Sequence, residues 1–125
     1  MRLFLRHVPI TALCLLLAGC YETFTPIASA RVTHWQGGAP QTDAQPLPAE
    51  QVAQWSAWLQ SHRWGWHPVT ATYRPGVVIS LTHSDGTTST VNLMQKVLVA
   101  GMHQRDLSKV ECQELHSLMG MKNAC

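Results

Sequence analysis

The chain has 125 residues, of which 46% are hydrophobic and 13% are charged, with a formal net charge of +2 at pH 7. This length suffices for one domain with a modest hydrophobic core. No basic patch accompanies the small net charge, so we do not expect a nucleic acid as partner.

The first 19 residues have the composition of a secretory signal peptide. Arg2 and Arg6 provide a positively charged start, an apolar run covers residues 8–17, and the small pair Ala18-Gly19 follows. The apolar run is too short to span a bilayer comfortably. We therefore expect residues 1–19 to be a cleaved leader.

The leader ends in Leu17-Ala18-Gly19-Cys20, which resembles the lipobox of bacterial lipoproteins. The resemblance implies that Cys20 takes a diacylglyceryl group on its thiol, is exposed as the new N-terminus by cleavage, and is acylated there. Several acyl chains hold a protein firmly to a bilayer, since each buried methylene contributes about 0.8 kcal/mol. Because Tyr21 rather than aspartate follows, the family's sorting habit implies the outer membrane, with the domain facing the periplasm. The alternatives are a plain signal peptide with a cysteine at its cleavage site and a buried apolar helix.

Cleavage before Cys20 changes both the charge and the cysteine count. Removing the two leader arginines leaves seven basic and seven acidic side chains, so the mature chain is neutral before its histidines are counted. Cys14 leaves with the leader and Cys20 carries lipid, so Cys112 and Cys125 remain. In an oxidising compartment this pair predicts one disulfide, which contributes roughly 3 kcal/mol at best for so short a loop. Two free thiols, or a bridge between chains, are the alternatives.

Residues 20–46 are rich in Thr, Ala, Gln, Gly and Pro, which predicts a lipidated N-terminus followed by a flexible tether. One strand-like island, residues 30–36, interrupts this composition. Val32 or Trp35 in this island is a candidate for docking on the domain. The domain itself is expected over residues 47–125.

A helix is predicted over residues 48–63. Proline suits its first position, and Glu50 favours the positive end of the helix dipole. Apolar residues recur at helical spacing, and Gly65 is a natural stop. The face is formed by Val52, Trp55, Leu59 and His62, and Trp58 widens it.

Two segments rich in β-branched residues, 77–83 and 87–93, predict a β-hairpin. A two-residue Asp85-Gly86 turn would put their apolar residues on opposite faces of the sheet. A three-residue loop over 84–86 instead pairs Ile79 with Val91 and gathers the apolar residues on one face, with Gly86 in the left-handed conformation. We predict this second register, with weaker strands over 69–73 and 97–100.

The last helix has a strong start signal, because Ser108-Lys109-Val110-Glu111 is a capping box. Leu107 and Cys112 occupy the hydrophobic-staple positions, and Gly120 is expected to end the helix. The predicted fold class is therefore α+β. It has an N-terminal helix, an antiparallel meander of three to four strands and a C-terminal helix, with the helices packed on one sheet face.

The mature chain holds five tryptophans, and they have two interpretations. Trp55 and Trp58 are expected in the core beneath the first helix. Trp64 and Trp66 would share one side of an extended segment and, with His67 and His83, form a candidate surface for a ligand or partner. The alternative is that Trp64 and Trp66 close the same core.

Neither catalysis nor metal binding has a motif in this sequence. No serine lies in G-x-S-x-G, no glycine-rich phosphate loop occurs, and the acidic residues form no obvious pair. The histidines lack the H-x-x-x-H spacing of a helical metal site. We therefore expect no catalytic residue, no metal, and no cofactor apart from the covalent lipid on Cys20.

The domain also resembles small uncharacterised lipoproteins of Gram-negative bacteria, through the segments Leu47-Pro48 to Gly65, 81–86 and 91–94. This resemblance implies no activity. Our leading hypothesis is a non-catalytic lipoprotein that binds another envelope protein, in an inhibitor or immunity role or as an envelope scaffold. The alternative is a small-ligand or cell-wall glycan binder that uses Trp64 and Trp66. A hydrolase acting on envelope material is a third hypothesis.

Overall fold

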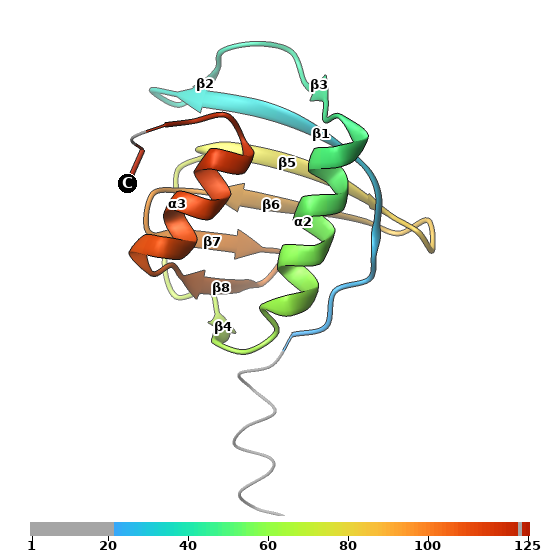
Figure 1. Cartoon of the computed structure of the whole chain (residues 1–125). Helices are drawn as coiled ribbons and strands as arrows, with labels where there is room; N and C mark the ends of the chain where they lie inside the picture. Colours follow the sequence, from blue (N-terminus) through green and yellow to red (C-terminus); the bar gives the residue numbers. More distant parts are fainter. Residues whose placement is uncertain (1–21, 123) are drawn as a thin grey trace, which may run out of the picture.

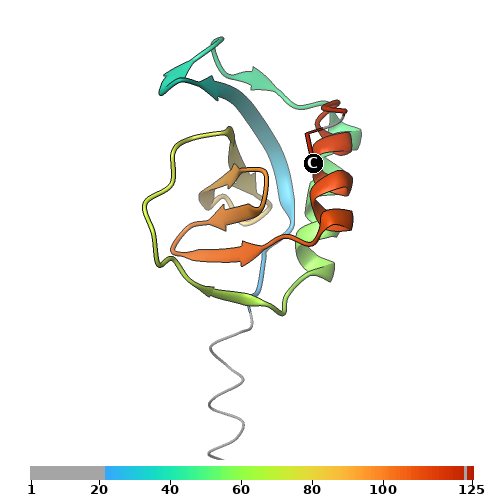
Figure 2. The same ribbon diagram turned by 90° about the vertical axis from the view of Figure 1, so that its left-hand side faces the viewer.

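The computed structural model describes residues 22–122 and 124–125, in which two helices pack against one antiparallel sheet. The α+β class is confirmed, and both helices cover the same face of the sheet (Figures 1 and 2). The predicted leader (1–19) and the lipid site Cys20 lie outside the described residues. None of the helices described is long and apolar enough to cross a membrane. In chain order the elements are β1 (Ile27–Gln36), β2 (Ala39–Pro40), β3 (Gln45–Pro46), α2 (Ala49–Ser61), β4 (Trp66–Pro68), β5 (Val77–His83), β6 (Thr88–Leu93), β7 (Val97–Ala100), β8 (His103–Asp106) and α3 (Lys109–Leu118).

The sheet is larger than the predicted meander of three to four strands. β5 to β8 follow one another as antiparallel neighbours, and the full order is β2-β1-β5-β6-β7-β8-β4, with β3 paired to β1. β8 has no apolar alternation that sequence analysis could detect. It forms because the two-residue turn Gly101-Met102, in which Gly101 has a φ of +60°, pairs Ala100 with His103.

The tether prediction is wrong for most of residues 20–46. β1 pairs with β5 along nearly its whole length, placing Val32 beside Ile79, and its residues Ile27, Ala30 and Val32 are buried. The domain therefore begins well before residue 47, and strands rather than a helix open it. The composition of this segment does not indicate a strand, because a strand needs only a few apolar residues when its main chain is paired on both sides.

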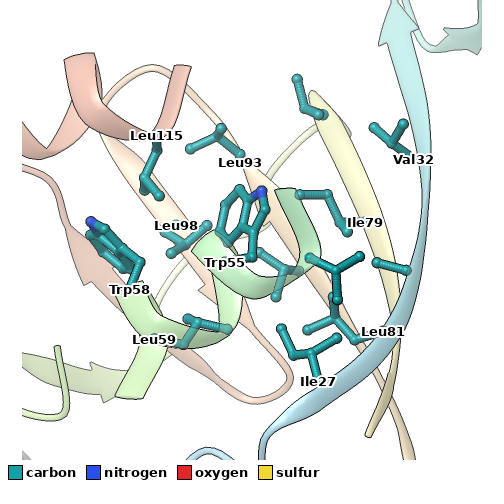
Figure 3. Packing of buried hydrophobic residues seen from close by; sticks show 14 of the residues in the cluster. Ile27, Val32, Trp55, Trp58, Leu59, Ile79, Leu81, Leu93, Leu98 and Leu115 are labelled. Atoms are coloured by element: carbon teal, nitrogen blue, oxygen red, sulfur yellow. The ribbon is translucent and has the colours of Figure 1, made fainter. Parts of the chain in front are cut away.

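The helix predicted over 48–63 is α2, and its apolar face meets the sheet as expected. Trp55 is fully buried in the middle of the hydrophobic cluster, and Trp58, 8% exposed, lies nearer its edge (Figure 3). The indole Nε1 of Trp55 donates to the Sδ of Met119 at 3.2 Å, which links α2 to the end of α3. The expectation that this helical pair belongs to the core is confirmed.

The predicted hairpin register is confirmed. Ile79 pairs with Val91, and the three-residue loop 84–86 closes through the backbone N–H of Gly86 donating to the His83 carbonyl at 3.0 Å. Gly86 has a φ of +84°, the left-handed conformation that this loop requires. All apolar residues of β5 and β6 that face the helices therefore join one core.

The prediction of a strand over 69–73 is wrong. This segment instead crosses the face of the sheet that the helices leave open (Figure 2), held by side chains rather than by a ladder. The Oε1 of Gln104 accepts hydrogen bonds from the backbone N–H of Thr70 and from the Tyr73 hydroxyl, and the side chain of Asn92 binds the main chain around Gly76.

The second helix begins and ends as predicted. Ser108 and Glu111 form the capping box of α3, and Gly120, with a φ of +72°, reverses the chain after it. That reversal brings Cys125 within disulfide-bonding distance of Cys112, so the internal bridge is confirmed.

The inclusion of β1 in the sheet can be tested by truncating one buried side chain. Val32→Ala removes two buried methyl groups opposite Ile79, so we expect the free energy of unfolding to fall by roughly 2 kcal/mol in urea titrations. Ser29→Ala, on the exposed side of the same strand, serves as the control, with a change under about 0.5 kcal/mol. Equal, negligible effects of both substitutions would restore the tether interpretation.

Candidate functional site

The structure separates the two tryptophans that were expected to share a surface. Trp64 is 57% exposed, whereas Trp66 is fully buried. Gly65 lies between them with a φ of +89°, and this left-handed residue breaks the extended alternation on which the prediction depended. A paired-tryptophan binding surface is therefore a wrong prediction, and Trp64 alone faces outward.

Trp66 belongs to the core that the first described residues help to close. Its ring lies 5.1 Å from that of Phe24, centroid to centroid. Its Nε1 donates to the carbonyl oxygen of His62 at 2.6 Å, so its polar atom is satisfied inside the fold.

The two histidines of the predicted surface have different partners in the fold. His67, on β4, is half-buried and its Nε2 lies 3.5 Å from a carboxylate oxygen of Asp106. His83 is buried, and its Nδ1 donates to the Thr25 carbonyl at 2.8 Å. Its Nε2 lies 2.6 Å from the Ser89 hydroxyl oxygen, within hydrogen-bonding distance. His83 thus joins the start of β1 to the β5–β6 hairpin.

A cluster that sequence analysis did not anticipate centres on Arg105 of β8. Its Nε and Nη2 donate to Oε2 of Glu111 at 2.9 and 2.7 Å, and its Nη1 donates to the carbonyl oxygen of Trp64. The other oxygen of Glu111, Oε1, accepts the backbone N–H of Ser108 in the capping box. One carboxylate therefore caps α3 and positions Arg105 at the same time. We call Trp58, His62, Trp64, Arg105 and Glu111 the Arg105 cluster.

Trp58 of α2, and His62 and Trp64 just after its end, supply the aromatic part of the Arg105 cluster. The rings of Trp58 and His62 stack at 3.9 Å, and the guanidinium carbon of Arg105 lies 5.8 Å from the Trp58 ring centroid. The Nε1 of Trp58 donates to Glu114 at 3.2 Å, so α2 and α3 are linked across their interface. The φ of +89° at Gly65 favours glycine, and a Cβ there would lie 2.8 Å from Nη1 of Arg105 and displace that guanidinium.

The environment of Glu111 favours its charged form. Burial by itself raises the pKa of Glu111, but hydrogen bonds from Arg105 and Ser108 and the guanidinium charge outweigh it and hold the pKa below that of an ordinary glutamate. The sequence pattern around Glu111 indicates only a capping residue. Its second role has no sequence signal, because Arg105 lies on a strand six positions earlier.

An open groove of about 670 Å³ runs between α2 and α3 beside this cluster. Trp58 and Leu118 contribute its apolar lining, Ala57 leaves room in it, and Glu114 is its charged residue. The remaining lining residues are polar and uncharged: Gln54, Ser61 and Ser117.

One group of metal-ligating atoms gathers in the described part of the chain. Cys112, His116 and Cys125 place their sulfurs and a ring nitrogen within 4.8 Å of one another. The two sulfurs are at bonding distance from each other, and the Nδ1 of His116 donates to the Cys112 carbonyl at 2.8 Å. In this disulfide state neither sulfur is a thiolate, so the group does not offer the ligands that zinc binds.

The stabilising role of Glu111 predicts a pH dependence. Since its pKa is lower in the folded than in the unfolded chain, its contribution is full above about pH 4.3 and is lost as the pH falls through the folded-state value. We expect Glu111→Gln to lower the free energy of unfolding by roughly 1.5–3 kcal/mol at neutral pH, with the difference from wild type narrowing in acid.

Urea titrations at several pH values measure this difference directly. Glu50→Gln, an exposed glutamate in the first turn of α2, is the matched control, and we expect a smaller effect from it. A Glu111→Gln deficit that stays constant from neutral pH into acid would contradict the assigned role.

Comparisons with known proteins add no relative from which a role could be transferred. Models of protein families give no match to the chain, and neither curated proteins nor solved structures do. The function must therefore be argued from the chain's own residues.

Proposed function

We propose that this protein is a lipid-anchored lipoprotein of the bacterial cell envelope, which binds another envelope protein and catalyses no reaction. The anchor is Cys20, at the outer membrane facing the periplasm. The basic start, the apolar run and Leu17-Ala18-Gly19-Cys20 support this attachment. The Cys112–Cys125 disulfide agrees with an oxidising compartment.

The main support for partner binding is the groove between α2 and α3. A bound segment would contact Trp58, a residue type enriched in binding hot spots. The Arg105 cluster and the Trp58–Glu114 hydrogen bond hold the walls of the groove together. Walls positioned in this way need little ordering on binding, which favours affinity.

The charge of the groove indicates the chemistry of its occupant. Glu114 is the charged residue in the lining, so the partner segment carries apolar side chains and a basic residue that faces this carboxylate. An inhibitor or immunity role and a scaffold role both use such a segment. The identity of the captured protein distinguishes the two.

Attachment through Cys20 is tested by mass spectrometry of the mature N-terminus. We expect a chain that begins at Cys20 and carries thioether-linked and amide-linked lipid. Cys20→Ala should abolish lipidation and release the protein from membranes, whereas Cys14→Ala, within the leader, should leave both unchanged. A mature chain with unmodified Cys20 would refute the anchor.

The groove is tested by filling it. Ala57→Arg places a large cation in the groove, and Ala53→Arg makes the same change at an exposed position of α2 outside its lining. In affinity capture from detergent-solubilised envelopes, we expect wild type and Ala53→Arg to retain one specific protein and Ala57→Arg to lose it. Capture of the same proteins by both variants, or of none by wild type, argues against partner binding here.

A further inference from the structure

The first described residue, Glu22, binds the loop after α2 and the start of β8, at one end of the domain. Its backbone N–H donates to the Arg63 carbonyl at 2.8 Å, and its carboxylate lies 2.8 Å from Nδ1 of His103. Phe24 then packs on the buried Trp66. The folded domain therefore holds the chain from Glu22 onward.

Two exposed hydrophobic side chains lie next to the residues that bind Glu22. Trp64, 57% exposed, follows Arg63, and Met102, 80% exposed, precedes His103. Val110 is the other large hydrophobic residue that is exposed in the described part of the chain. The carbonyl of Trp64 is held by Arg105, and the carbonyl of Met102 accepts the backbone N–H of Val69. Both apolar groups are thus presented from fixed backbone.

The proposed lipid site is too close to this end for a spacer. Cys20 precedes Glu22 by two residues, and two residues reach at most about 7 Å even when fully extended. A lipid bonded to Cys20 would therefore bring Glu22, the loop after α2 and the β7–β8 turn close to the bilayer surface. The tether expected from composition would have kept them away from it.

We propose that Trp64 and Met102 rest in the interfacial region of the bilayer and fix the orientation of the domain on it; this inference rests on the lipid anchor of the proposed function. Tryptophan prefers the membrane–water interface because its ring is apolar and its N–H can still meet water or headgroups. Burying these two side chains removes apolar area from water. The partner of this surface is lipid, and a protein partner uses the groove.

The orientation keeps the groove accessible. α2 ends at Ser61, close to the membrane-facing loops, and its first turn lies toward the other end of the domain, where β2 turns (Figure 1). The groove between α2 and α3 therefore runs up from the bilayer, and a protein of the periplasm could reach it.

Quenching of tryptophan fluorescence by lipid tests this surface. The full-length lipidated protein is reconstituted into vesicles of phosphatidylethanolamine and phosphatidylglycerol, with phospholipids brominated near the top of their acyl chains. We expect wild type to be quenched and Trp64→Phe to lose most of the quenching. Trp35→Phe, near β2 at the other end of the domain, is the control and should retain it. Met102→Glu should reduce the quenching of Trp64, because a carboxylate disfavours insertion.

Flotation of the same samples separates the two proposals. Protein that floats with the vesicles, with quenching that Trp64→Phe removes, supports the inference. Protein that floats but is quenched equally in wild type and Trp64→Phe overturns the inference and leaves the anchor intact. Protein that carries no lipid and does not float overturns the anchor and, with it, the inference.

Discussion

The pairing of β1 with β5 is the constraint on which most of this structure depends. It adds the β1–β3 segment to the sheet and extends the hydrophobic core to Ile27 and Val32. It also starts the sheet at Ile27, within the segment that composition predicts to be a tether. A segment that looked like a spacer is consequently a structural strand, and the end of the domain near Glu22 becomes the end that a lipid on Cys20 would hold at the membrane.

A second constraint is the carboxylate of Glu111, which accepts hydrogen bonds from two elements at once. One oxygen completes the capping box of α3 and the other holds Arg105 on β8. Arg105 in turn binds the carbonyl of Trp64 and lies near the ring of Trp58. A charged pair with 15% and 16% of its side-chain surface exposed is stabilising only when its geometry and hydrogen bonds are complete, as they are here. The same pair connects the groove side of the domain to the loop that carries Trp64.

Under the proposed function, two regions of the domain surface have different partners. The loops beside Glu22 expose apolar side chains on fixed backbone, which suits a lipid interface. The groove between the helices is lined by Trp58, Leu118 and the carboxylate of Glu114, which suits a protein segment. The disulfide adds a covalent link between α3 and the segment after Gly120, away from the Glu22 end.

Local patterns in the sequence determined the parts of the fold that depend on neighbouring residues. The capping box Ser108–Glu111, the apolar face of α2 and the three-residue loop closed by Gly86 were all predictable, because helical spacing, capping and register act over a few residues. Tertiary structure alone decided which distant segments meet. β1 became a strand because β5 and β3 pair with it, Trp66 entered the core because Gly65 turned it away from Trp64, and Arg105 met Glu111 through the packing of α3 on the sheet. The residues in each of these contacts have only weak local preferences for a particular structure. The contacts therefore form only when the whole domain packs.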